Sequence, residues 1–430
     1  MHLTIHRGTK EIGGSCVELR TDTARIVVDL GMPLVDEKRE RFDDKGLAGK
    51  SVEELIEKKI LPGVEGLYKG QERKIDALII SHAHADHYGL LNCIHDDIPV
   101  YMSRGSKELI ELSGLFTPFK IGGINAEVIK PKRQFCVGDI KILPYPVDHS
   151  AFDALAFLIE ADGKKVFYSG DFRGHGCKSV LFRRMIDVPL LGVDCLIMEG
   201  SVIGSGERPY RDEKAVRSRI KKILNEAGQV TFLSCSSQNI DRLVSAYKAC
   251  LKTGAVFVID IYTAYVLDRV RKVSKHIPAF NWRNIRVKFY KNQADILAEK
   301  VSKELLYFYN TKKIDLFEMN ASKGKYLMLA RDNSIFPGVV KGLDNARGAK
   351  MIYSMWKGYL TEEFKGYCGR EGIEIEEVHT SGHASVEDLK AFAKALNPGM
   401  LIPIHTFSPE SYEGLFDNVR MLKDGEGMTI

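Results

Sequence analysis

Short apolar runs that end in a polar residue recur along the chain and predict β-strands. The runs are rich in Val, Ile, Leu and Phe, which is typical of buried strands. Polar side chains should therefore collect where the strands end. The predicted strands are residues 26–29, 77–81, 166–169, 195–199, 232–234, 256–260 and 401–405.

Helical spacing separates several of these runs. In residues 212–227 the apolar residues repeat every three or four positions, and Gly228 follows as a stop signal. A second helix is predicted to begin at Ser385, which forms an S-x-x-D capping box with Asp388, and to end at Asn397. Strands that alternate with helices indicate α/β layers, in which ligands bind at the carboxyl ends of strands.

Length and composition limit the class of protein. The chain has 430 residues, 44% of them apolar, which is enough for two or three domains. No apolar run reaches the roughly 18 residues that cross a bilayer, and the first residues do not resemble a secretion signal. The eight cysteines form no C-x-x-C pair. We therefore expect a protein of the reducing cytoplasm with no membrane partner.

Charge is distributed unevenly along the chain. The whole sequence carries a net charge of +5, but residues 201–378 hold 31 basic and 20 acidic residues. The remainder holds 31 basic and 37 acidic residues. A basic block in an otherwise acidic chain indicates either a polyanionic partner or a solvated, lysine-rich surface.

The strongest chemical signal is the segment Ser81-His-Ala-His-Ala-Asp-His87, directly after a predicted buried strand. His82 and His84 project to the same side of an extended segment, and Asp86 and His87 follow as the chain bends into a helix. Imidazole and carboxylate together suit zinc, and two ions ~3.5–4 Å apart can share an activated water. A single histidine on a loop would more simply be a solvated residue, but this cluster indicates a metal site.

Two metal ions need more ligands than this segment offers. Three residues at other predicted strand ends can supply them: His149 in PYPVDHS, Asp171 in FYSGDF and His405 in LIPIH. Asp171 is the natural bridging ligand, because a carboxylate has two oxygens. His405 is either a ligand or a residue that supports one, and we favour a ligand.

These motifs resemble those of the metallo-β-lactamase superfamily. The resemblance rests on Asp29 in VVDLG, the H-x-H-x-D-H segment, His149 in DHS and Asp171 in SGD, in that order. It implies a four-layer αββα sandwich with two zinc ions at one edge. Asp29 is then expected to orient a metal-ligating histidine. The fold hosts lactamases, thioesterases, lactonases, oxidoreductases and nucleases, so it does not identify the substrate.

Later segments narrow the resemblance to the β-CASP nucleases, and among these to ribonuclease J in a short form without its C-terminal domain. They are Glu199 in LIMEGS, the HTSGHA segment at 379–384, the closing PIH, and the segments GTKEIGGSCVEL and SQNIDR. The resemblance implies an α/β β-CASP domain at 203–372, inserted into a sandwich formed by 1–202 and 373–430. In the family this insert clamps single-stranded nucleic acid over the metals. Residues 171–176, with Arg173 and His175, and residues 353–358 match nothing in that enzyme, and their roles stay open.

Phosphodiester hydrolysis suggests roles for the remaining residues. The metal ligands, Asp86 among them, hold the ions that activate a water, and His379 assists in stabilising developing charge. His383, oriented by Glu199, is predicted to protonate the leaving oxygen. Glu199 could instead be a charge at a helix N-terminus. Ser237, Asn239, Arg242, Ser381 and Gly382, together with His379, are candidate contacts to the substrate backbone. For the first three, a capped helix start with a solvated Arg242 is the alternative.

The sequence therefore predicts a two-metal nuclease that cleaves single-stranded RNA by exonucleolytic or endonucleolytic hydrolysis. Three alternatives stay open: a β-CASP nuclease acting on DNA, a small-molecule metallohydrolase of lactonase or thioesterase type, and a non-catalytic nucleic-acid binder. Manganese in place of zinc and an oligomeric state are open as well.

Overall fold

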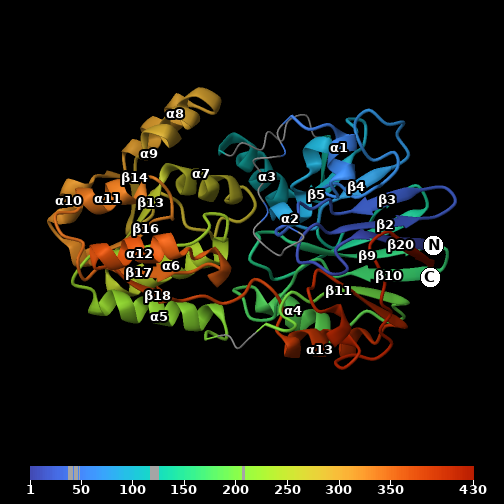
Figure 1. Ribbon diagram of the computed structural model, residues 1–430. Helices are drawn as coiled ribbons and strands as arrows, with labels where there is room; N and C mark the ends of the chain where they lie inside the picture. Colours follow the sequence, from blue (N-terminus) through green and yellow to red (C-terminus); the bar gives the residue numbers. More distant parts are fainter. Residues whose placement is uncertain (37–41, 43–46, 48, 117–124, 206–208) are drawn as a thin grey trace. The chain divides into compact units, whose positions relative to one another are not determined.

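The computed structural model describes residues 1–36, 42, 47, 49–116, 125–205 and 209–430. The chain folds into two compact units (Figure 1). The first unit comprises residues 1–114, 119–206 and 382–430, and the second comprises residues 115–118 and 207–381. No helix in the described ranges is both long and apolar enough to cross a membrane.

The first unit contains two mixed β-sheets. The strands of its first sheet are, in spatial order, β20 (Glu426–Thr429), β1 (His2–Arg7), β2 (Cys16–Arg20), β3 (Arg25–Val28), β4 (Ala77–Ile79), β5 (Val100–Ser103) and β6 (Ala126–Ile129). The strands of its second sheet are β19 (Met400–Ile404), β11 (Cys195–Glu199), β10 (Lys164–Tyr168), β9 (Leu155–Ala161), β8 (Ile140–Pro146) and β7 (Phe135–Val137).

The two sheets pack face to face and carry helices on their outer faces. Ile26 and Ile79 of the first sheet share one buried core with Phe157 and Ile197 of the second. On the other face of the second sheet, strand residues pack against α4 (Ser179–Asp187) and α13 (Val386–Leu396). Figure 1 shows α1 (Val52–Glu57), α2 (Ala85–Tyr88) and α3 (Arg104–Phe116) on the opposite side, next to β3, β4 and β5. This αββα layering confirms the predicted fold class.

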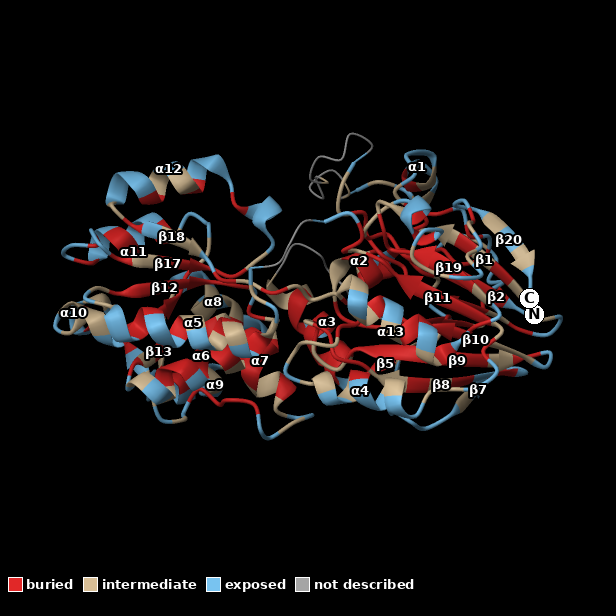
Figure 2. Cartoon of the chain, turned by 90° about the horizontal axis from the view of Figure 1, so that it is seen from below, coloured by how far each residue is buried: buried red, intermediate tan, exposed pale blue. Residues whose placement is uncertain are grey.

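The second unit is built on one seven-stranded sheet in which every pair of neighbouring strands is parallel. Its strands are mostly buried, and its helices turn their exposed faces outward (Figure 2). All carboxyl ends of a parallel sheet lie at one edge, so the loops that follow these strands lie at the same edge. The strand order is β15 (Lys313–Ile314), β14 (Ile285–Lys288), β13 (Val256–Asp260), β16 (Tyr326–Leu329), β12 (Thr231–Ser234), β17 (Lys350–Tyr353) and β18 (Glu374–Glu377). The helices are α5 (Glu213–Glu226), α6 (Ile240–Thr253), α7 (Ile261–Val270), α8 (Lys291–Lys300), α9 (Lys303–Asn310), α10 (Leu316–Asn320), α11 (Phe336–Gly342) and α12 (Glu362–Glu371).

The unit boundary after the insert differs from the sequence expectation. We expected residues 373–430 to complete the sandwich. Strand β18 instead pairs with β17 of the second unit, from Lys350 opposite Glu374 to Tyr353 opposite Glu377. The second unit therefore extends to residue 381.

Local signals placed most element ends well. Strands 195–199 and 256–260 have the predicted bounds, and Ser385 caps α13 in a capping box with Asp388. Strands 26–29, 166–169 and 401–405 end one residue earlier than predicted, and strand 77–81 ends two residues earlier. After the first and the third of these strands, Asp29 and His405 adopt left-handed backbone with φ of 61° and 54°. This conformation turns the chain out of the strand and directs each side chain into the site described next.

Candidate metal centre

The chemically active side chains of the first unit lie on loops at strand ends. His82, His84, Asp86 and His87 follow β4, with the last two in the short helix α2. The others follow the second sheet's strands or end them: His149 after β8, Asp171 after β10, Glu199 at the end of β11, and His405 after β19.

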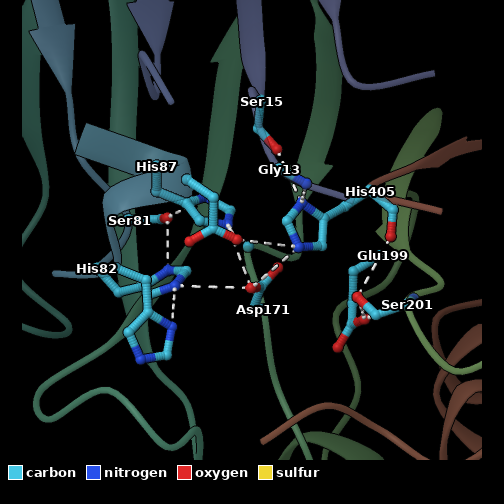
Figure 3. Close-up of polar contacts among 12 residues, drawn as sticks. Gly13, Ser15, Ser81, His82, His87, Asp171, Glu199, Ser201 and His405 are labelled. Carbon is cyan, nitrogen blue, oxygen red and sulfur yellow. Dashed lines mark hydrogen bonds and ion pairs between the residues drawn. The ribbon is translucent and has the colours of Figure 1, made fainter. Parts of the chain in front are cut away.

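Asp171 is the common member of three potential ligand groups. In each group the ligand atoms lie within 4.8 Å of one another. Oδ2 of Asp171 lies 3.2 Å from Nε2 of His87 and 3.6 Å from Nε2 of both His82 and His405 (Figure 3). The groups are His82, His84, His149 and Asp171; Asp86, His87, Asp171 and His405; and Asp171, Glu199 and His383.

The unsatisfied atoms of this cluster fit bound cations. Among the described residues, Nε2 of His87, both carboxylate oxygens of Asp171 and Nε2 of His405 are buried and form no hydrogen bond. A buried polar atom without a partner is costly, and a divalent cation would satisfy several at once. The donor atoms are imidazole nitrogens and carboxylate oxygens, which zinc accepts.

In two histidines, Nδ1 contacts a hydrogen-bond acceptor outside the metal centre, and Nε2 faces the centre. Nδ1 of His149 donates to the carbonyl oxygen of Gly382 at 2.6 Å, which leaves the lone pair on Nε2. Nδ1 of His87 donates to Oδ2 of Asp29 at 2.8 Å. Burial would lower the pKa of His87, but the carboxylates of Asp171 and Asp29 outweigh burial and raise it well above the ordinary value, so a cation bound at Nε2 would displace the proton there. Burial lowers the pKa of His149 and His82 well below the ordinary value and that of His84 to about 4, so all three are neutral at pH 7.

Asp29 is held rigidly behind the centre. It is fully buried, and its carboxylate accepts hydrogen bonds from the backbone N–H of Ser81 (2.7 Å), the Ser81 hydroxyl (2.8 Å) and the Tyr168 hydroxyl (2.8 Å). These contacts place Asp29 where an orienting residue for His87 must lie. Sequence reasoning did not identify Ser81 or Tyr168 as its partners.

His405 differs from the other candidate ligands. The backbone N–H of Gly13 donates to its Nδ1 at 3.2 Å, and the hydroxyl of Ser15 lies 3.1 Å from the same nitrogen. As a ligand through Nε2, the ring would carry its proton on Nδ1 and donate it to Ser15, so the bond from Gly13 would be given up.

Beside the ligand groups lies a second constellation made of Glu199, Ser201 and His383. Nδ1 of His383 lies 3.3 Å from Oε2 of Glu199, and the Ser201 hydroxyl lies 2.9 Å from Glu199 and 3.1 Å from His383. Burial alone would lower the pKa of His383, but the carboxylates of Glu199 and Asp171 outweigh it and raise this pKa to about 9. Turns, not a helix, follow Glu199, so it is no helix-terminal charge. Ser201 was missed, although it stands two residues after Glu199.

Of the candidate substrate contacts, Gly382 lies in the first unit and the others belong to the second unit. Asn239 caps α6 by accepting from the backbone N–H of Arg242. Arg242 is fully buried, not solvated, and its guanidinium lies 2.9 Å from Glu213. It also donates to Nδ1 of His379 at 3.4 Å. Ser237 is buried too and shares a hydrogen bond of 2.6 Å with Thr263.

The unmatched segment 171–176 connects parts of the metal centre. Arg173 is fully buried, and its Nε lies 3.4 Å from Asp148, the neighbour of His149. Gly176 lies against this ion pair so closely that a Cβ there would collide with it. His175 lies 3.4 Å from Asp388 of the α13 capping box. Arg173 and His175 therefore connect the loop of Asp171 to the loop that carries His149 and to helix α13.

Comparisons with known proteins agree with this geometry. A family profile described as beta-lactamase superfamily domain matches residues 63–224. The chain therefore contains a domain of the metallo-β-lactamase superfamily. Together with relatives named ribonuclease J, this domain makes the chain a metal-dependent hydrolase. A second profile, described as Zn-dependent metallo-hydrolase RNA specificity domain, matches residues 373–410.

Relatives of this protein extend over almost the whole chain. An RNase J-like protein of Methanocaldococcus jannaschii is 26% identical over 96% of this chain and 93% of its own length. Ribonuclease J of Helicobacter pylori is 23% identical over 93% of this chain, which spans only 55% of that protein. A crystal structure of a protein of unknown function from Enterococcus faecalis shares the fold with a TM-score of 0.80 at 22% identity, covering 100% of this chain and 99% of that one.

Proposed function

We propose that the chain is a nuclease that hydrolyses phosphodiester bonds of single-stranded RNA. The observation that carries the proposal is the arrangement of two ligand groups that share Asp171. His383 lies 3.6 Å from the same carboxylate and is in contact with Glu199 and Ser201. The names of the relatives and the RNA specificity profile over residues 373–410 support RNA as the substrate.

Each of the two groups would hold one divalent cation, zinc by preference. His82, His84 and His149 would hold the first, Asp86, His87 and His405 the second, and Asp171 both. Such ions supply an activated water and neutralise charge on the phosphate.

The residues of the chain would do the rest of the chemistry. Asp29 and the carbonyl of Gly382 keep His87 and His149 in the tautomers that present Nε2 to the centre. His383, kept protonated by Glu199, would give a proton to the leaving oxygen. The Ser201 hydroxyl lies within reach of both and would hold the imidazole in place.

A digest of 5′-labelled single-stranded RNA and DNA, run with and without chelator, tests this function. We expect chelator-sensitive cleavage of RNA, with product lengths that separate exonucleolytic from endonucleolytic action. Cleavage of DNA alone would move the substrate to DNA. Cleavage of neither, with turnover of a lactone or thioester, would assign a small-molecule hydrolase. In the same preparations, elemental analysis should find about two metal equivalents in protein never exposed to chelator.

A further inference from the structure

Residues 353–358, which the resemblance left without a role, carry the exposed ring of Trp356, which contacts the ring of Tyr359 directly after the segment. Trp356 is 60% exposed and Tyr359 is 37% exposed. Their ring centroids lie 5.2 Å apart at an interplanar angle of 86°. Tryptophan and tyrosine are enriched at interfaces because each combines an apolar ring with a polar group, so an exposed pair of these rings is a candidate contact surface.

Two hydrogen bonds to the Trp356 carbonyl close the turn that carries these rings. Tyr359 N–H donates to the carbonyl of Trp356 at 3.0 Å, and the Tyr353 hydroxyl donates to the same carbonyl at 3.5 Å. The Trp356 ring lies on the backbone of Gly358, where a Cβ would collide with it. The glycine thus lets the ring lie against the chain and present itself to solvent, which limits the entropy that binding would cost.

The pair stands at the edge of the sheet where ligands of parallel sheets bind. Trp356 follows the carboxyl end of β17, while Tyr262 follows β13 and Arg331 follows β16. Because all these strands are parallel, their following loops share one edge. At that edge the Arg331 guanidinium lies over the Tyr262 ring at 5.7 Å, and the Tyr262 hydroxyl accepts from Gln238 at 3.0 Å.

The excess of positive charge in the second unit lies before residue 351, because residues 351–378, which carry the rings, hold 3 basic and 6 acidic residues. Lys357 lies between the two aromatic residues in sequence; its side chain is 73% exposed, and its Nζ lies 3.6 Å from the Glu377 carboxylate. Residues 201–378 carry an excess of basic residues. Aromatic rings interleaved with cations bind single-stranded nucleic acid, because rings stack on bases and cations follow phosphates.

We propose that Trp356 and Tyr359 form a stacking platform for bases of single-stranded nucleic acid, on the second unit and apart from the metal ligands. The proposal rests on the proposed function, since it concerns the same substrate. It goes beyond that function by assigning a base-binding site to a segment that had no role.

The chain allows a direct optical test, because it contains only two tryptophans. The ring of Trp282 lies 5.7 Å from the Tyr247 ring and 5.3 Å from the Arg271 guanidinium, and Trp282→Phe leaves Trp356 as the single tryptophan, whose emission can be excited selectively over tyrosine. The probe is a single-stranded oligonucleotide with phosphorothioate linkages, which slow cleavage. An abasic strand of equal length and charge is the matched probe. A base stacked on Trp356 should quench its fluorescence, whereas the abasic strand should leave it unchanged.

Binding of the labelled oligonucleotide, followed by anisotropy in the full-length chain, gives the second measurement. Trp356→Ala should weaken binding by roughly 5- to 150-fold, and Trp356→Phe should recover most of the loss. The matched control is Tyr307→Ala, which removes a 72% exposed ring on α9 and should bind like the wild type.

The outcomes separate this inference from the function on which it rests. If the wild type binds the strand but Trp356 is not quenched, or if Trp356→Ala binds like the wild type, the platform is refuted and the nuclease stands. Equal quenching by the abasic strand would also refute base stacking. If the wild type binds no single strand at all, the proposed function falls and the platform falls with it.

Discussion

At the scale of single residues, the centre depends on which atom of each side chain carries a proton. In His149 and His87, the hydrogen bond from Nδ1 to the Gly382 carbonyl or to the Asp29 carboxylate fixes a proton on Nδ1. His383 is set by Glu199, which favours its protonated form. Three histidines of similar sequence surroundings thus acquire different chemistry from their partners.

His383→Ala should retain the bound metal and substrate affinity while losing roughly 10²–10⁴ in rate, because it removes only the proton donor. Glu199→Gln should show a smaller loss, since it keeps the shape and removes the charge. Rates on single-stranded RNA and elemental analysis of the same samples measure both effects.

A substrate with a good leaving group provides the control for His383. A nitrophenyl phosphodiester needs no protonation, so both variants should recover on it. If they stay equally inactive there, or if metal content falls with activity, His383 is a ligand or a positioning residue.

His405→Ala tests the ligand whose Nδ1 receives a hydrogen bond from Gly13. If Nε2 binds a cation, the metal content of the variant should fall from about two equivalents to about one, because one cation loses a ligand. Elemental analysis after dialysis measures this. Retention of both equivalents with loss of activity would instead make His405 a donor through Nε2–H.

At the scale of elements, buried charges join neighbouring strands and the loops that follow them. Arg173 and Asp148 connect the loops after β10 and β8, and both side chains are fully buried. Glu18 of β2 connects to its neighbours β1 and β3 through His6 at 2.9 Å and Arg25 at 3.0 Å. Removing one member of such a group leaves a buried charge without its partner.

Arg173→Gln should lower the free energy of unfolding by roughly 3–5 kcal/mol, because Asp148 then stays buried without its cation. It should also lower metal content, since Asp148 adjoins His149 and Arg173 follows Asp171 by two residues. Thermal unfolding and elemental analysis measure the two effects. Arg183→Gln, at an exposed position of α4, is the control and should change neither. Wild-type behaviour of Arg173→Gln would show that the pair does not support the centre.

Glu18 should make stability depend on pH in the acid range. Burial would raise its pKa, but hydrogen bonds from His6 and Arg25 outweigh burial and lower the pKa to about 2 from an ordinary 4.5. A lowered pKa stabilises the fold above pH ~4.5, and the stabilisation is lost as pH falls from ~4.5 towards ~2.

Glu18→Gln should therefore cost at most about 3 kcal/mol at neutral pH and flatten the fall of stability in acid. Urea unfolding between pH 3 and 7 measures this. Glu57→Gln at the exposed end of α1 is the control. An acid limb as steep in Glu18→Gln as in the wild type would contradict the assignment.

At the scale of the whole molecule, a sandwich that carries the metal ligands is combined with a parallel α/β unit that carries the excess of basic residues. If the basic unit binds a single strand, affinity should fall steeply as salt rises, with a slope near 0.7 per phosphate contacted. Titrations at several salt concentrations measure the slope. A flat dependence up to physiological salt would argue against a polyanionic partner and for a small-molecule substrate.

The sequence alone determined the parts of this protein that depend on local order. Apolar runs and capping residues predicted strands 195–199 and 256–260 and the start of α13, because these signals act within a few residues. The H-x-H-x-D-H segment predicted a metal site for the same reason.

Only the tertiary structure decided which residues support the ligands through hydrogen bonds. Ser201, Tyr168 and Ser15 became partners of site residues up to 390 positions away, and Arg242 became a buried ion pair instead of a solvated charge. Such partnerships depend on how distant strands pair and how loops meet, and no short-range pattern of residues records that.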